Sequence, residues 1–308
     1  MSVQTLLGPQ SPTPNLKQAM DLMELSGPVV CITAGWRDSE GEIDDLIAEA
    51  GQPVEDLMIY HRAQDVFASE PDFAALQRER QDKLLELQQL YRIRLNPTLL
   101  AARKLLRMDA QADLLRLEQR AAISQVRALD RHHVRRLASI HSDFDARRAS
   151  MDIPAATAQR EQVHEKLENA GLVLIAGGHV AVLLNRIRLF RLGALLKRKP
   201  VIAWSAGAMV LCDRIVLFHD DAPQGKRDAE VLDAGLGIVQ NLIPLPHARS
   251  RLDWSSRTRM ALFSRRFAPA ICATLDNGST LQVQNSRIIA ASASSVITRT
   301  GRKKGLKA

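Results

Sequence analysis

The segment around Ser205 has the composition of a tight turn that presents a nucleophilic serine. Apolar residues Val201–Trp204 lead into the serine, small residues surround it, and an apolar, helix-compatible run follows at 209–211. This order is typical of a nucleophile elbow, in which a strand turns sharply into a helix and exposes one hydroxyl above a sheet. In the general pattern G-x-S-x-G, Ala203 replaces the first glycine here and Gly207 supplies the second. The alternative is a Ser-Ala-Gly turn that only packs a helix on a strand.

Two other segments could complete acyl-transfer chemistry at this serine, one with backbone donors and one with a base. The pair Gly177-Gly178 follows an apolar run, and ligands of open α/β sheets bind beyond the carboxyl ends of such strands. A backbone N–H at these glycines could therefore approach a substrate carbonyl. For the base, His247 lies in a loop that contains prolines, and His179 and His219 compete for the same role.

The composition is that of a globular protein with one large domain, or with one domain and a substantial insertion. The chain has 308 residues, of which 46% are apolar and 25% are charged, so disorder of the whole chain is excluded. No run approaches the roughly 18 to 20 apolar residues that span a bilayer. The N-terminal segment also lacks the apolar core of a secretory signal. We therefore expect a cytoplasmic protein without a membrane partner.

The charge and the cysteines do not point to nucleic acid, metals or cofactors. The net charge is +8, but part of it is concentrated at 299–308, and aromatic residues make up only 4% of the chain. Because no aromatic residues interleave with a basic stretch, binding of nucleic acid is not indicated. The cysteines lie far apart among apolar residues, so we expect buried free thiols and neither a metal nor a cofactor. They are Cys31, Cys212 and Cys272.

The chain divides into zones that differ in composition and in the spacing of their apolar residues. Apolar runs alternate with helical patterns on both sides of a long helical zone, which indicates a parallel sheet covered on both faces. The expected fold class is α/β, a three-layer, doubly wound, mainly parallel sheet with a long α-helical insertion. The runs 271–275 and 280–283 are typical of a late hairpin. The expected segments are a flexible N-terminus at 1–21, a discontinuous core at 22–71 and 171–298, the insertion at 72–170, and a basic tail at 299–308.

The insertion at 72–170 contains no glycine and repeats apolar residues at helical spacing. This pattern predicts a long helical hairpin or a small bundle. We expect Pro97 to break the first helix, an interruption near Asp109, and a further helix after Pro154. Two roles are open. The insertion is either a packed decoration of the core or an arm that forms a homodimer or binds another protein.

Taken in order, these segments resemble peptidase family S51, the serine peptidases typified by dipeptidase E and cyanophycinase, within the class I glutamine amidotransferase-like fold. The resemblance rests on the order of the segments more than on any one of them. They are Gly177-Gly178, Trp204–Ala208, Gly235–Gly237, Pro246-His247 and Leu275–Ser279. The resemblance implies that Ser205 is the nucleophile and His247 the general base. It also implies that the N–H groups of Gly178 and Ala206 line the oxyanion hole.

The third catalytic residue of the family, usually a glutamate, falls in the turn after Leu275 and is replaced in this chain. The most natural alignment places Asn277 at its position, with Asp276 one residue earlier. In an extended segment, a shift of one residue turns the side chain to the opposite face. Either the loop directs Asp276 at His247, or Asn277 orients the imidazole without stabilising its charge.

The residues after the general base could bind an acidic substrate. Arg249 and Arg251 follow it, and a guanidinium suits the N-terminal aspartate that dipeptidase E-like enzymes prefer. His179 and His219 are further candidates. Solvated surface positions are the alternative for the arginines, and a plain turn is the alternative for the loop that begins at His219. The expected function is a serine hydrolase that cleaves a small, Asp-containing peptide or amide through an acyl-enzyme. The alternative is a weakened or inactive family member that acts as a binding protein through its helical insertion.

Overall fold

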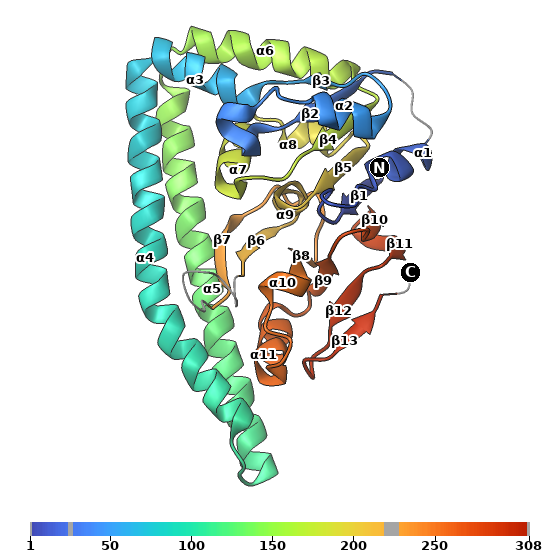
Figure 1. Cartoon of the computed structure of the whole chain (residues 1–308). Coiled ribbons are helices and arrows are strands. Elements are labelled where there is room, and N and C mark those ends of the chain that lie inside the picture. Colours follow the sequence, from blue (N-terminus) through green and yellow to red (C-terminus); the bar gives the residue numbers. More distant parts are fainter. Residues whose placement is uncertain (1, 24–26, 219–227, 307–308) are drawn as a thin grey trace.

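The largest sheet of the protein has seven strands in the order β11-β10-β1-β5-β4-β2-β3 (Figure 1). The computed structural model describes residues 2–23, 27–218 and 228–306. The strands from β1 to β3 in this order are parallel, and β10 and β11 extend the sheet antiparallel at one edge. The bounds are β1 (Gln4–Leu7), β2 (Val29–Ile32), β3 (Glu55–Asp56), β4 (Leu172–Ile175), β5 (Val201–Trp204), β10 (Thr280–Gln284) and β11 (Arg287–Ser292).

Helices cover both faces of this sheet. Along β2, Val30 and Ile32 belong to one apolar cluster, whereas Val29 and Cys31 belong to another. A strand buried on both faces requires a continuous apolar run, as the sequence shows. The helices are η1, a 3₁₀ helix (Ala34–Ser39), α1 (Leu16–Asp21), α2 (Asp44–Ala50), α3 (Ile59–Ser69), α4 (Pro71–Arg107), α5 (Ala112–Ala149), α6 (Pro154–Asn169), α7 (Val180–Leu189), α8 (Gly193–Leu196), α9 (Ala206–Leu211), α10 (Ala248–Arg251) and α11 (Arg257–Phe267). The prediction of an α/β protein with a large, mainly parallel sheet is confirmed.

Two smaller sheets lie beside the large one. Strands β8 and β9 pair in parallel and continue into β12 and β13, whereas β6 and β7 form an antiparallel pair. The bounds are β6 (Arg214–Leu217), β7 (Glu230–Ala234), β8 (Leu242–Pro246), β9 (Ile271–Leu275), β12 (Ser295–Ile297) and β13 (Lys303–Gly305). The expected late hairpin does not form, because β9 pairs with β8 and β12 while β10 pairs with β1 and β11. The turn at 276–279 instead carries the chain from one sheet to the other.

Segments near both ends of the chain belong to sheets, where we expected a flexible N-terminus at 1–21 and a basic tail at 299–308. Strand β1 is fully buried between β5 and β10, and α1 follows it. Near the other end, β13 pairs with β12. Four residues followed closely by a glycine and prolines give little periodic signal, and neighbouring strands from elsewhere in the chain bury them. The division of the chain into a core and an insertion stays a prediction.

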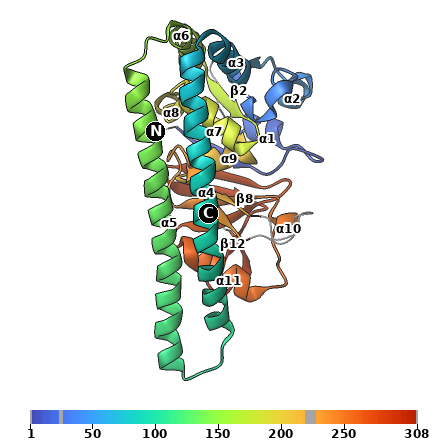
Figure 2. The same ribbon diagram turned by 90° about the vertical axis from the view of Figure 1, so that its left-hand side faces the viewer.

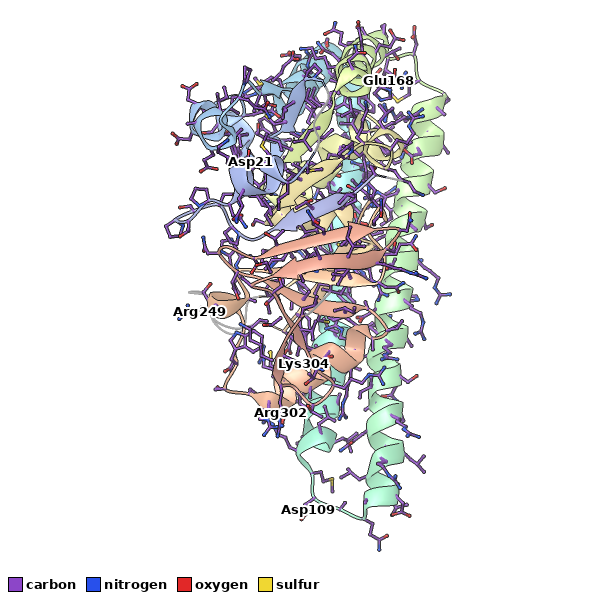
Figure 3. All side chains as sticks on the ribbon, turned by 90° about the vertical axis from the view of Figure 1, so that its right-hand side faces the viewer. Asp21, Asp109, Glu168, Arg249, Arg302 and Lys304 are labelled. Atoms are coloured by element: carbon purple, nitrogen blue, oxygen red, sulfur yellow. The ribbon has the colours of Figure 1, made fainter. Side chains whose placement is uncertain are left out.

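Helices α4 and α5 run side by side along the length of the molecule and extend beyond the rest of it (Figure 2). The turn between them contains Asp109, at the far tip of this helical hairpin (Figure 3). Helix α4 continues through Pro97, where we expected a break. Pro97 is exposed, so water can bind the carbonyl that loses its donor, while Leu95 and Leu99 hold the helix in an apolar cluster with α5. Within the described residues, no helix is long and apolar enough to cross a membrane.

Candidate active site

Ser205 lies in the turn between β5 and α9, and its backbone is strained. Its φ of 51° and ψ of −119° fall in a region that residues with a side chain rarely adopt. The serine is half-buried, and the helix begins at the next residue. A sharp strand-to-helix turn with this backbone presents a hydroxyl beyond the end of the sheet, which is the geometry of a nucleophile elbow.

Two glycines provide the space for this strained turn. A Cβ at Gly207 would lie 2.2 Å from the carbonyl oxygen of Ile175, the last residue of the neighbouring strand β4. A Cβ at Gly177 would lie 2.9 Å from the Cβ of Ser205 itself. A larger residue at either position would force the backbone to move, so the small residues around the serine have a steric function.

Gly35, which the sequence pattern did not single out, joins the loop after β2 to the loop after β4. Its carbonyl accepts the N–H of His179 at 2.7 Å, and a Cβ at Gly178 would lie 2.4 Å from the same oxygen. Gly178 also has a φ of +104°, a conformation that favours glycine. The available signal was a glycine soon after an apolar strand, the same pattern that marked Gly177-Gly178.

The backbone N–H groups of Gly178 and Ala206, near Ser205, have no acceptor among the described residues. Gly178 follows the glycine that packs against the serine side chain, and Ala206 follows the serine in the chain. Free donors near a nucleophile can stabilise the oxyanion that forms during acyl transfer. The role of both groups as oxyanion donors stays a prediction.

His247 follows β8 at the point where this strand ends beside β9. The two strands are parallel, and the N–H of His247 donates to the carbonyl of Leu275 at 3.1 Å. The left-handed backbone of His247 (φ 56°) turns the chain into α10. Helix α9, which begins after Ser205, packs against β8. The predicted nucleophile and base thus come from different sheets that meet at α9.

Asp276 and Asn277 follow β9 and have different partners. The Oδ1 atom of Asp276 accepts the backbone N–H of Arg249 at 2.8 Å, which ties this carboxylate to the helix that follows His247. The Nδ2 atom of Asn277 donates instead to the carbonyls of Pro9 and Ser11, at 3.1 and 2.9 Å. The amide of Asn277 therefore holds the N-terminal segment, while the carboxylate stays on the side of α10.

The ring of His247 is half-buried and makes no hydrogen bond with Ser205, Asp276 or any other described residue. Burial lowers the pKa of His247, and the positive charge of Arg251 lowers it further, whereas the negative charge of Asp276 raises it. Asp276 therefore acts on the imidazole through its charge. Hydrogen bonds between catalytic groups often tighten only when substrate is bound, so the separation is compatible with catalysis.

The predicted substrate-binding residues differ in their surroundings. Arg249 is exposed at the outer edge of the molecule (Figure 3), and Arg251, further along α10, is partly buried. His179 is exposed, and its Nδ1 atom accepts the N–H of Val182 at 3.3 Å. This contact caps α7, so the histidine has a local structural role. His219 lies outside the described residues.

The cysteines offer no alternative nucleophile. All three are buried and free. Burial raises the pKa of Cys272 to about 12, and it raises the pKa of Cys212, next to α9, well above its ordinary value. In the described part of the chain, no group of three or more His, Cys, Asp or Glu side chains could hold a metal ion.

Comparison with known proteins gives one family match. The model of peptidase family S51 matches residues 125–291, more than half of the chain, and this region includes Ser205, His247 and Asp276. No curated protein sequence matches. Among solved structures, a peptidase from an acI-B1 Actinobacterium is similar, with 14% identity and a TM-score of 0.47; the match covers 100% of this chain and 95% of that chain.

Proposed function

The chain belongs to peptidase family S51, and from that membership we propose that it is a serine-type peptidase that cleaves a small peptide or amide through an acyl-enzyme. The observation that carries the proposal is the strained backbone of Ser205, directly before a helix. Tightly packed glycines hold this turn in a conformation that a serine does not adopt without support, which favours a functional purpose for the strain.

In the proposed mechanism, the hydroxyl of Ser205 attacks the substrate carbonyl while His247 accepts its proton. The N–H groups of Gly178 and Ala206 stabilise the oxyanion that forms. His247 then gives the proton to the leaving amine, whose bond to the carbonyl carbon breaks. A water molecule, activated by the same histidine, hydrolyses the acyl-enzyme ester and restores the serine hydroxyl.

We assign the role of supporting His247 to Asp276. Its negative charge raises the pKa of the histidine, and it accepts a hydrogen bond from the start of α10. The amide of Asn277 is occupied by two backbone carbonyls of the N-terminal segment. A carboxylate stabilises an imidazolium by charge, which an amide does not. These contacts support an active enzyme over an inactive family member.

An acidic residue in the substrate is the proposed source of specificity. Arg251 is partly buried and close enough to His247 to lower its pKa. A substrate carboxylate bound by this guanidinium would therefore lie near the catalytic base. Arg249, exposed on the same short helix, is the second candidate for this contact.

Three finer expectations belong to the same proposal: a class I glutamine amidotransferase-like layering, a cytoplasmic location, and a homodimer or protein contact through 72–170. Helices on both faces of the large sheet support the layering. Exposed apolar side chains on the helical hairpin support the contact. They are Leu85, Leu90, Ile93, Leu100, Leu114 and Leu117.

A fluorophosphonate probe tests the nucleophile. The probe should label the full-length protein, and Ser205→Ala should abolish both labelling and hydrolysis of a panel of aspartyl dipeptides and amides. Ser255→Ala is the matched control, because Ser255 is exposed and its hydroxyl contacts only Asp253 among described residues. Labelling that persists in Ser205→Ala would reject this serine as the nucleophile.

A further inference from the structure

A cavity of about 690 Å³ lies between the helical hairpin and the core, and arginines dominate its charge. Figure 1 shows α7 beside the part of the hairpin nearest to α3 and α6. The cavity is lined from both sides of this contact by Arg80 of α4, Arg148 of α5, Arg188 of α7, and Arg191 after α7. It shares no lining residue with the Ser205 site. Its volume is in the range of small-molecule sites.

Arg148 is buried without a polar partner. The residue is only 4% exposed, and its side chain makes no hydrogen bond or ion pair with any described residue. The guanidinium carbon lies 5.5 Å from the ring centre of Phe73. Burial lowers the pKa of Arg148 to about 10, so it stays charged at neutral pH. Its nitrogens are not among the fully buried atoms without a partner, so they stay accessible from the cavity that Arg148 lines and are free to bind a ligand's anionic groups.

Arg80 is nearly as buried, at 6% exposed, and is only partly satisfied. One of its terminal nitrogens donates to Oδ1 of Asn185 at 3.0 Å, but its buried Nε has no partner in the structure. The guanidinium carbon lies 4.1 Å from the ring centre of Phe144. The aromatic contact covers a face of the guanidinium, and hydrogen bonds can form only at its edge.

The carboxylates of the cavity do not neutralise these arginines. Asp233 accepts from Arg188 at 2.8 Å and lies 2.9 Å from Nε2 of His141, so its Oδ2 atom is already engaged. Asp145 is the other carboxylate of the lining, and it is exposed and in no ion pair with Arg148 or Arg80. Four arginines against two carboxylates leave the cavity with excess positive charge.

We propose that this cavity binds a small molecule that carries two or more anionic groups, phosphate or carboxylate, with Arg148 and Arg80 as its main donors. A guanidinium fork matches either group in a two-point contact. Such a ligand supplies the acceptors that Arg148 lacks and balances the excess charge. The site is independent of the proposed peptidase chemistry.

Isothermal titration calorimetry at constant ionic strength tests this site, with pyrophosphate as the phosphate probe and citrate as the carboxylate probe. At least one of them should bind the full-length protein with one-to-one stoichiometry, and the stronger probe identifies the preferred group. Arg148→Met should weaken that binding about ten- to hundredfold, the scale of charged hydrogen bonds. Arg136→Gln, an exposed arginine of the same helix, is the control and should bind like the wild type.

Two further measurements keep the test decisive. Without anions, Arg148→Met should be at least as thermally stable as the wild type, because it removes a largely buried charge that has no ion pair or hydrogen bond with the described residues. Arg191→Gln changes an exposed side chain and should weaken probe binding several-fold without affecting the fold. The proposal is overturned if neither probe binds, if Arg148→Met binds equally well, or if that variant is less stable without anions.

Discussion

The sheet edge around Ser205 and the contact between the helical hairpin and the core are built by different means. Around the serine, backbone atoms and glycines set the geometry, since a Cβ at Gly207 has no room. At the hairpin, charged side chains connect different elements. Arg266 of α11, for example, donates a hydrogen bond to Asp130 of α5, which is 136 residues away in the sequence. The strained turn at Ser205 is set mainly by small residues next to it in the sequence, whereas the hairpin contact depends on distant residues meeting.

Two buried arginines at the hairpin contact differ in whether the protein satisfies their donors. Arg266 donates to both oxygens of Asp130, to the hydroxyl of Tyr91 and to the carbonyl of Ala229. Arg148 donates to no described residue. Arg266 is thus held by the fold itself, whereas the guanidinium of Arg148 has no such partners and is left available for a ligand in the cavity.

The largest expected effect concerns catalysis at the backbone-built site. His247→Ala removes the general base, so kcat/KM should fall about 10⁴-fold while the unfolding temperature changes little. Steady-state kinetics with a peptide cleaved by the wild type measures this. Asn277→Ala should cause a much smaller loss, since its amide binds the N-terminal segment. Equal losses would show that Asn277 is as important as the base itself and would contradict the assignment of the supporting role to Asp276 alone.

The next largest effect concerns the stability of the hairpin contact. Arg266→Met should lower the free energy of unfolding by about 3–5 kcal/mol, because Asp130 stays buried without its partner. Urea unfolding followed by circular dichroism measures the change. The double variant Arg266→Met/Asp130→Leu should recover most of the loss. A double variant as unstable as the single one would assign the loss to packing instead of charge.

A smaller effect is expected from the glycine that supports the elbow. Gly207→Ala should destabilise the protein by about 1–3 kcal/mol, because its Cβ would lie 2.2 Å from a backbone oxygen. Gly305→Ala is the control: its Cβ meets nothing within 4 Å, and the change should stay within about 0.5 kcal/mol. Thermal unfolding of both variants compares them. Equal stabilities would show that the turn at Ser205 relaxes easily.

The smallest expected effect is a displacement of the pH profile. His247 must be neutral to accept a proton, so kcat/KM should fall as the pH drops through its lowered pKa. Arg251→Gln removes a charge that lowers this pKa, so the acid limb should move to higher pH. Arg249→Gln should leave it in place. An acid limb that moves to lower pH in Arg251→Gln would contradict the assignment of His247 as the base.

Much of the sheet and of the elbow could be predicted because the signals are local. The continuous apolar runs at β2, β4 and β5 are typical of buried strands, and small residues beside Ser205 allow close backbone approach. The predicted interruption near Asp109 and the predicted helix after Pro154 are also present, and the second follows from a proline at the first position of that helix. The exception is Pro97, where packing of Leu95 and Leu99 against α5 outweighs one lost hydrogen bond.

The amino-acid sequence by itself determines the strand runs, the elbow and the order of the motifs. These features depend on steric contacts and on burial patterns among residues that are neighbours in the chain. The pairing of β1 between β5 and β10, the partners of Asp276 and Asn277, and the meeting of Arg80 with Arg148 do not. Each of these depends on segments far apart in the chain, and long-range packing alone sets which side chains gain a partner and which are left without one.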